Sequence, residues 1–289
     1  MRKKEDENFT PPINSAQTSS TTILGTSIYS NSKPTVLSYL AIFETLWKQT
    51  ELFQQLKQED ILKTEFINIA AHELRTPTQS IIGYCEMLEA FPEKKDEYMH
   101  TIKKNAERLY KLTQDILDVA RIESNSLKLQ REKIELNVIL NETVIEFFSK
   151  YTNIKKDVKL NFIPNQSNDK IFAFVDKNRI QQVIFNLLDN AVKFTDKGEV
   201  IISIKRDNNN NHAKVRIQDT GQGIDAEVLP RLFEKFATKS ERGTGLGLYI
   251  SKSIVEAHGG KIWTEINNNS NDKGATFLFT LPLRNHYQK

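Results

Sequence analysis

A histidine, an acidic residue and a hydroxyl lie within about one helical turn at His72, Glu73 and Thr76. A neutral imidazole nitrogen is a good nucleophile near pH 7, and a neighbouring carboxylate can accept its proton or orient its ring. Thr76 comes four residues after His72 and shares its helix face, so its hydroxyl could position a water for the reverse hydrolysis. A lone histidine is more often an ordinary surface residue, and only these neighbours favour a reactive His72.

Two further features indicate a special environment around His72. At about 100° per residue, its ring is expected to lie roughly opposite an apolar seam through Phe66, Ala70 and Leu74, facing water. Pro77 then interrupts a segment that otherwise continues as a helix. Because an interior proline removes a hydrogen bond and kinks a helix, we expect a bend there that admits a bulky second domain.

Three polar side chains share one face of a later helix, because Asn186, Asn190 and Lys193 stand at positions i, i+4 and i+7. Carboxamide oxygens suit Mg²⁺, which binds through few protein ligands plus phosphates. A lysine one turn away can neutralise phosphate charge. Taken alone, the motif is more simply a polar stripe on a surface helix.

The first of two glycine-rich segments, DTGQGI, starts at Asp219 after a predicted strand. Gly221 and Gly223 would let the backbone turn sharply and approach a ligand, and Asp219 could accept a hydrogen bond from the amino group of adenine. A hairpin turn or an exposed loop explains this segment nearly as well.

The second segment, GTGLGL, carries Gly243, Gly245 and Gly247 at the start of a helix. Backbone N–H groups at such a position can cradle phosphates. No strand is predicted before it, so a dinucleotide-binding βαβ fingerprint is a poor interpretation.

The segment Ile224–Arg242 between the glycine-rich segments is expected to be a mobile lid over the ligand. Phe233 and Phe236 of its LFEKF motif are expected to be core aromatics. Lys239 and Arg242 could reach a terminal phosphate, but solvated charges are the simpler interpretation.

The elements that position His72 are predicted to be two helices. Thr35 to Thr76 contains neither Gly nor Pro, and apolar spacings of four and three continue to Leu88. After a turn at residues 91–94, a second helix is expected to carry one apolar face: Ile102, Ala106, Leu109, Ile116 and Ala120. One such antiparallel hairpin has too little core to stand alone, so two copies are predicted to pair as a four-helix bundle, a homodimer with two-fold symmetry.

The pattern after about Leu127 predicts an α/β sandwich, a mixed sheet with helices on one face. The expected helices are Asn137–Lys150, Lys177–Phe194 and Leu246–Ala257. The expected strands are Val158–Ile163, Ile171–Val175, Glu199–Lys205, Lys214–Asp219, Lys261–Ile266 and Ala275–Leu281. Asn-rich loops at Asn208–Asn211 and Asn267–Asn269 are expected to join hairpin strands.

Composition bounds the remaining possibilities. With 289 residues, the chain is long enough for two modest domains plus extra segments. The net charge of +3 gives no indication of a nucleic-acid partner, and none is expected. The single cysteine, Cys85, fits a reducing cytoplasm. No apolar stretch reaches the roughly 20 residues of a membrane span, so we expect a cytoplasmic protein.

The motifs together resemble one family. FINIAAHELRTP resembles the H-box of sensor histidine kinases of two-component systems. NLLDNAVKF, DTGQGI, LFEKF and GTGLGL resemble the N, G1, F and G2 boxes of the same family's Bergerat-type ATP-binding domain, in the family's order. The polar composition of residues 1–35 predicts a disordered tail, and the helical spacing of 36–60 predicts a signalling helix or coiled coil. The resemblance implies a dimerisation and histidine phosphotransfer domain (61–126) and a catalytic ATP-binding domain (127–285).

The resemblance also implies a role for each H-box and N-box residue. It implies that His72 is the phosphoacceptor, that Glu73 is the base, and that Thr76 supports phosphatase activity in members that have it. Asn190 corresponds to the Mg²⁺ ligand, with Asn186 as its companion.

For the remaining nucleotide contacts, the resemblance implies that Lys193 meets a phosphate and Asp219 reads adenine. The loop glycines that it implies are Gly221, Gly223, Gly243, Gly245 and Gly247. The implied function is an ATP- and Mg²⁺-dependent autokinase that passes the phosphoryl group from histidine to an aspartate in the receiver domain of a separate response regulator.

Two rival functions stay open. One is a non-transferring ATPase of the gyrase and mismatch-repair superfamily, whose members carry a glutamate base where this chain has Asn186. The other is a non-enzymatic dimeric scaffold with a degenerate kinase domain, which the intact His72, Asn190 and Asp219 argue against.

Overall fold

The computed structural model describes residues 33–151, 157–164, 170–207, 211–238, 243–265 and 274–283. The chain divides into two compact units, residues 1–61 and 62–289. In the first unit the described part is the beginning of helix α1 (Lys33–Ala90). Residues 1–32 lie outside the described part, so the predicted disorder of the tail stays a prediction. Within the described residues, no helix combines the length and apolar character that a membrane crossing requires.

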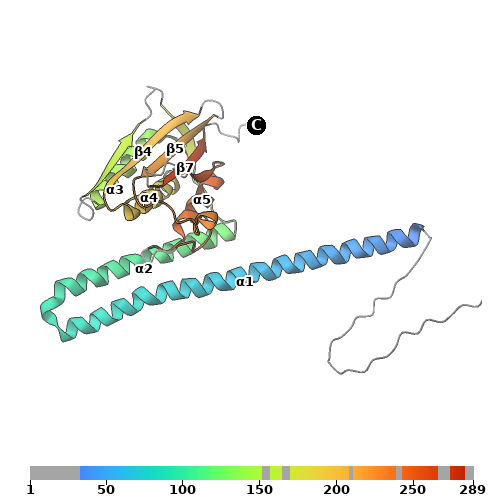
Figure 1. Cartoon of the computed structure of the whole chain (residues 1–289), viewed down its shortest axis with the longest axis horizontal. Helices are drawn as coiled ribbons and strands as arrows, with labels where there is room; N and C mark the ends of the chain where they lie inside the picture. The colour runs from blue at the N-terminus through green and yellow to red at the C-terminus, as the bar shows by residue number, and fades with distance from the viewer. Residues whose placement is uncertain are drawn as a thin grey trace, which may run out of the picture. The chain divides into compact units, whose positions relative to one another are not determined.

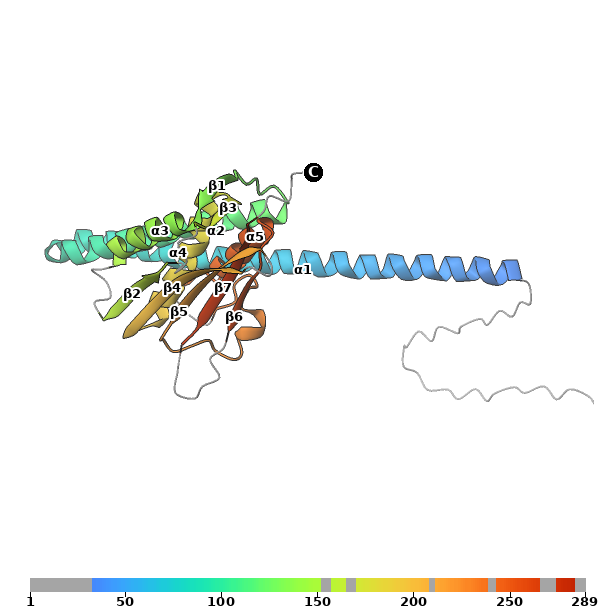
Figure 2. The ribbon, with the colours of Figure 1, turned by 90° about the horizontal axis from the view of Figure 1, so that it is seen from above.

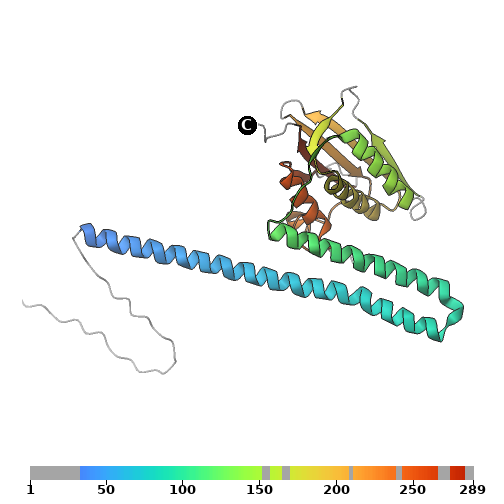
Figure 3. The ribbon, with the colours of Figure 1, turned by 180° about the vertical axis from the view of Figure 1, so that it is seen from behind.

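In the second unit, the rest of α1 forms an antiparallel hairpin with α2 (Lys95–Glu123) through the short helix η1 (Pro92–Lys94) (Figures 1 and 3). The predicted seam of α1 is confirmed, because Ala70 and Pro77 are buried. Helix α1 runs on through Pro77, and the bend expected at this residue stays a prediction. One missing hydrogen bond does not end a helix whose flanking turns are intact and whose proline is packed.

The predicted apolar face of α2 is only partly right. Ala106 and Ala120 are exposed in this chain, whereas Leu112 and Val119 are buried in the main hydrophobic core. The reason is that α2 packs on two partners. It contacts α1, for example through the rings of Tyr84 and Tyr98, and it contacts the helical layer of the α/β domain, which covers a face of α2 that the hairpin pattern alone does not reveal.

A five-stranded mixed sheet with the order β2-β4-β5-β7-β6 follows the hairpin. Its strands β2 and β4 are parallel, and the other neighbours are antiparallel. Figure 2 shows the strands side by side, with helices α3, α4 and α5 along one face. The bounds of the strands are Val158–Ile163 (β2), Gly198–Asp207 (β4), His212–Asp219 (β5), Ile262–Glu265 (β6) and Thr276–Pro282 (β7).

The three helices are α3 (Leu136–Tyr151), α4 (Lys177–Phe194) and α5 (Gly247–Ala257). The period of the strands fits this two-layer arrangement, because alternate residues Val200, Ile202 and Ile204 of β4 are buried beneath the helices. The α/β sandwich predicted from the sequence is therefore confirmed, with all six predicted strands and all three predicted helices present to within a few residues.

The sequence analysis does not predict one of the strands. The short β1 (Glu132–Glu135) pairs antiparallel with β3 (Phe172–Val175) as a separate two-stranded ribbon. The prediction that the two Asn-rich loops join hairpin strands is confirmed, because β4 pairs antiparallel with β5 and β6 with β7. The described residues do not include 208–210, 239–242 and 267–269, so the roles of Lys239 and Arg242 stay predictions.

His258, which follows α5, should make stability depend on pH. The ring is buried, its Nδ1 lies 2.7 Å from the carbonyl oxygen of Ile254, and its Nε2 accepts a hydrogen bond from the backbone N–H of Asp176 at 3.0 Å. Burial lowers the pKa of His258, nearby Arg131 acts in the same direction, and Asp176 opposes it. A lowered histidine pKa means that the unfolded chain binds the extra proton first, so stability is complete above about pH 6.5 and falls below it.

We therefore expect the melting temperature to be lower at pH 5.5 than at pH 7.5, because protonation of His258 favours the unfolded chain. In a His258→Asn variant, which cannot titrate at this position, the fall should be smaller than in wild type. Equal pH dependence in both proteins would show that protonation of His258 does not limit folding.

Candidate active site

A cavity of about 460 Å³ opens beside the helical layer, in the size range of small-molecule sites. Its wall comes from α4, from the segments after β5 and before α5, from β7, and from α2. The predicted pair Asn186 and Asn190 lines it, and so do these other predicted nucleotide residues: Lys193, Asp219, Gly223, Gly243 and Gly245. Gly247 lines it as well. The structure thus brings together motifs that are separate along the chain.

Helix α4 presents its polar face to the cavity. Asp176 is the N-cap of α4 and stabilises the start of the helix, because its side chain accepts a hydrogen bond from the backbone N–H of Arg179. Asn190 and Lys193 lie on the cavity side. Among the described residues, no three His, Cys, Asp or Glu side chains gather as a metal site. The carboxamide of Asn190 and the carboxylate of Asp189 both offer oxygen atoms at the cavity, and oxygen is the ligand type that Mg²⁺ prefers.

Asn186 has a second role that its sequence motif did not reveal. Its Nδ2 donates to the carbonyl oxygen of Gly247 at 3.3 Å and lies 3.4 Å from Oγ of Ser251. These contacts tie α4 to the first turn of α5. A Cβ on Gly247 would stand 3.4 Å from Cγ of Asn186, an ordinary van der Waals contact, so the space at this position does not by itself require a glycine.

Asp219 ends β5 and is buried. Its Oδ1 accepts hydrogen bonds from the backbone N–H groups of Gly221 at 2.9 Å and Ala275 at 3.1 Å. Burial raises the pKa of this carboxyl, and the two backbone donors counteract part of the rise. Within the described residues, the hydrogen bonds engage only Oδ1, which leaves Oδ2 as an acceptor for a ligand in the cavity.

Two glycines shape the backbone around the cavity. Gly245 has φ +67°, and a Cβ there would lie 2.6 Å from Cα of Phe236, so neither the conformation nor the space suits a side chain. Gly221 does not line the cavity. A Cβ on Gly221 would lie 2.2 Å from the carbonyl oxygen of Phe194, so its role is close packing against the end of α4.

His72, the predicted phosphoacceptor, does not line this cavity. The side chain of His72 is 74% exposed, as predicted, and its Nδ1 lies 3.9 Å from Oε1 of Glu73. The hydroxyl of Thr76 donates to the carbonyl oxygen of His72 at 3.4 Å, within the helix backbone. His72 is not among the residues that line the cavity, so the structure brings together the predicted nucleotide residues but does not place the predicted phosphoacceptor beside them.

Helix α2 supplies cavity residues that the sequence interpretation missed. Arg108, Lys111 and Asp115 all line the cavity. Asp115 is 5% exposed and accepts a hydrogen bond from the hydroxyl of Thr244, in the glycine-rich segment, at 3.1 Å. Burial raises the pKa of Asp115. These charged residues stand at helical spacing on one face of α2, which is a pattern that could have indicated them. The apolar residues of α2, from which the sequence predicts the hairpin, do not indicate this face.

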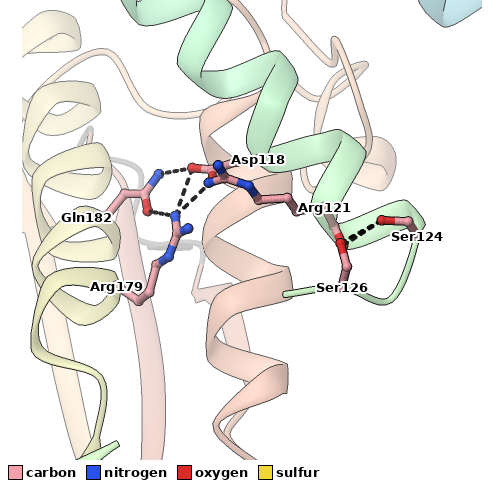
Figure 4. A network of polar contacts seen from close by, with 6 residues as sticks. All are labelled: Asp118, Arg121, Ser124, Ser126, Arg179 and Gln182. Carbon is pink, nitrogen blue, oxygen red and sulfur yellow. Dashed lines mark hydrogen bonds and ion pairs between the residues drawn. The ribbon is translucent and has the colours of Figure 1, made fainter. Parts of the chain in front are cut away.

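A network of charged and polar side chains joins α2 to α4 (Figure 4). Both carboxylate oxygens of Asp118 accept from Nη1 of Arg179 at 2.9 Å, and Oδ2 also accepts from Gln182 at 2.8 Å. Arg121 approaches the same carboxylate at 3.6 Å. Although Asp118 is buried, its charge is well paired and hydrogen-bonded, which is the condition under which a buried ion pair is tolerated.

A second set of contacts lies near the end of α2. The hydroxyl of Tyr249 donates to Glu123 at 2.6 Å, and Lys235 pairs with the same carboxylate at 2.9 Å. Burial and the Glu123 charge raise the pKa of Tyr249. The rings of Phe66 and Phe236 lie 5.4 Å apart, within the usual range for aromatic pairs. Phe236 is thus only partly a core residue, because it meets α1 as well.

Comparisons with known proteins agree with this arrangement. Residues 62–125 match the family described as the His Kinase A (phospho-acceptor) domain, and residues 175–285 match the family described as the histidine kinase-, DNA gyrase B- and HSP90-like ATPase. The sensor protein kinase WalK of Staphylococcus haemolyticus is 30% identical over 86% of this chain and 40% of its own length. The sensor protein SrrB of Staphylococcus aureus is 34% identical over 77% of this chain and 38% of its own length. The chain therefore spans about two fifths of the length of these relatives.

Solved structures show the same fold. The histidine kinase ThkA, in complex with the response regulator protein TrrA, aligns with a TM-score of 0.60 and 27% identity over 83% of this chain and 67% of that chain. The Acinetobacter baumannii histidine kinase AdeS aligns with a TM-score of 0.59 and 22% identity over 74% of this chain and 98% of that chain.

Proposed function

Because the chain belongs to the sensor histidine kinases of two-component systems, we propose that it is an ATP-dependent autokinase that phosphorylates His72 and then passes the phosphoryl group to an aspartate of a response regulator. One observation carries the proposal most directly. The cavity gathers Asn190, Lys193, Asp219 and the second glycine-rich segment, and its α2 wall is bonded to Glu73, next to His72.

The residues of the proposed site have different chemical roles. Asp219 accepts a hydrogen bond from the adenine amino group, and Lys193 offsets charge on the phosphates. Mg²⁺, held by Asn190 and by phosphate oxygens, would neutralise charge that develops on the transferring group. Asn186 holds the first turn of α5 in place through its Nδ2 while it lines the same cavity.

The proposed reaction transfers one phosphoryl group from ATP to His72 and one proton from His72 to Glu73. Nε2 of neutral His72 attacks the γ-phosphorus, the bond from that phosphorus to the bridging oxygen breaks, and ADP leaves with the electron pair. Glu73 takes the ring proton from Nδ1, the nitrogen closer to it. Since His72 lies outside the cavity, the ATP-binding domain must shift along the hairpin before transfer. The contacts of Asp118 and Glu123 with that domain are the ones such a shift would exchange.

Two partners follow from the proposal. A second copy of the chain would pair with the hairpin, whose helices leave Ile67, Ile82 and Leu117 exposed in one copy. A receiver domain would then meet phosphorylated His72 on the exposed side of α1. The solved complex of ThkA with TrrA supports this kind of partner. Residues 61–126 would form the dimerisation and phosphotransfer domain and residues 127–285 the ATP-binding domain, with 36–60 as signalling helix.

Incubation with Mg²⁺ and ATP labelled at the γ-phosphate tests the proposal. We expect label on the protein that acid removes and base does not, because a phosphohistidine behaves in this way, and no label from ATP labelled at the α-phosphate. Free phosphate without labelled protein would favour the ATPase. Neither product would favour the scaffold, and chelation of Mg²⁺ by EDTA should stop labelling.

A further inference from the structure

We propose that Arg108 is a positioning residue for the autokinase reaction, holding the carboxylate of Glu73 beside His72 at the wall of the nucleotide cavity. This inference rests on the proposed function. Arg108 belongs to none of the motifs from which the sequence predicted the site. It comes from α2, whereas Glu73 and His72 come from α1.

The contact between the two helices is direct. Nη2 of Arg108 donates to Oε2 of Glu73 at 3.1 Å. The side chains are 34% and 27% exposed, so water screens this pair less than it would screen a pair on an open surface. Hydrogen bonds in which both partners are charged are also stronger than neutral ones.

The other oxygen of the same carboxylate faces His72. Oε1 of Glu73 lies 3.9 Å from Nδ1 of His72, slightly beyond hydrogen-bond distance. Glu73 therefore stands between the guanidinium and the imidazole, with one oxygen toward each. A nucleophile, a base, and a third group that orients the base make up the usual arrangement for an activated nucleophile.

Orientation of Glu73 has a chemical consequence. His72 is exposed and, without a partner, its neutral ring would exchange its proton between Nδ1 and Nε2. A carboxylate fixed on the Nδ1 side favours the proton on Nδ1 and leaves the lone pair on Nε2. Nε2 can then attack phosphorus while the Nδ1 proton passes to Glu73, as in the transfer written above.

Arg108 also connects this pair to the nucleotide. It lines the cavity together with Asn190 and Lys193. A guanidinium has five N–H donors in a rigid fork, more than one carboxylate oxygen can use. Because the same side chain borders the cavity and holds Glu73, the base is tethered on the cavity side of α1 and not left to move over an exposed helix surface.

The test measures initial rates of phosphohistidine formation over a range of ATP concentrations. Arg108→Gln removes the charge and the fork, Arg108→Lys keeps the charge, and Glu73→Gln removes the base. Lys104→Gln is the matched control, because it removes one positive charge from an exposed position one turn away on the same helix. Binding of a fluorescent ATP analogue reports whether each variant is folded with an intact cavity.

We expect Arg108→Gln to lower kcat by about 10- to 100-fold, less than the roughly 10²- to 10⁴-fold that a general base contributes, because Glu73 itself remains. KM for ATP and the affinity for the analogue should change less than about two-fold. Arg108→Lys should recover part of the rate, and Lys104→Gln should match wild type. In the double variant, Arg108→Gln should add nothing to Glu73→Gln, because both changes remove the same function.

Each other result overturns the inference. A kcat near that of wild type would show that Glu73 needs no partner, and additive losses in the double variant would show that Arg108 acts independently of Glu73. A raised KM with normal kcat, or loss of analogue binding in both Arg108 variants, would assign Arg108 to nucleotide binding or to folding. Absence of label on wild-type protein would instead refute the proposed function itself.

Discussion

A chain with glutamine in place of His72 is expected to incorporate no acid-labile phosphate at all, while it still binds ATP. Glutamine lacks a nucleophilic nitrogen of imidazole type, so no variant geometry restores attack on phosphorus. The side chain of His72 is 74% exposed and takes no part in the hydrophobic core, so its replacement should leave stability almost unchanged. Label transfer from γ-labelled ATP, measured beside analogue binding, checks both parts.

The chain offers a matched control for this experiment. His100 is an exposed histidine on α2 of the same hairpin, and His100→Gln should label as wild type does. Persistent label on the His72 variant would place the phosphoacceptor elsewhere and would remove the basis of the proposed mechanism. A variant that loses both label and ATP affinity would indicate a fault in folding rather than in chemistry.

Asparagine in place of Asp219 is expected to weaken ATP binding by at least about 10-fold, although it changes only one atom. Oδ1 accepts from two backbone N–H groups, of Gly221 and Ala275, so the amide oxygen of asparagine must take that side. The amide nitrogen, a donor, then faces the amino group of adenine, which is also a donor. Burying a donor against a donor costs about 1–3 kcal/mol, or roughly one to two powers of ten in affinity.

The alternative orientation of the amide does not avoid the loss. With its nitrogen toward Gly221 and Ala275, the side chain would leave two backbone donors without an acceptor in a buried place, and stability would fall instead. Calorimetric titration with ATP and thermal unfolding distinguish the two cases. Asp157→Asn, an exposed change of the same type in the same domain, is the control and should alter neither quantity. Unchanged affinity in the Asp219 variant would show that adenine is read by another group.

Much of the site followed from the sequence, because the geometry involved is local. Regular turns of a helix place Asn190 and Lys193 on one face wherever that helix lies, and the end of a strand places Asp219 beside its own glycines. The exposure of His72 followed in the same way, from its position opposite the seam of α1. The repeats of helices and strands span only a few residues, so they can be recognised directly in the sequence.

The tertiary structure alone decided the features that depend on which elements meet. Arg108 and Asp115 become cavity residues only because α2 packs against the ATP-binding domain. Asn186 forms a hydrogen bond with α5 only because α5 starts at Gly247, close to the side chain of Asn186. The short strand β1 forms only because β3 lies beside it. Such contacts join residues that are far apart in the chain, so no local sequence pattern encodes them. They form because folding removes apolar surface from water, and the polar groups buried between the packed elements must then find hydrogen-bond partners.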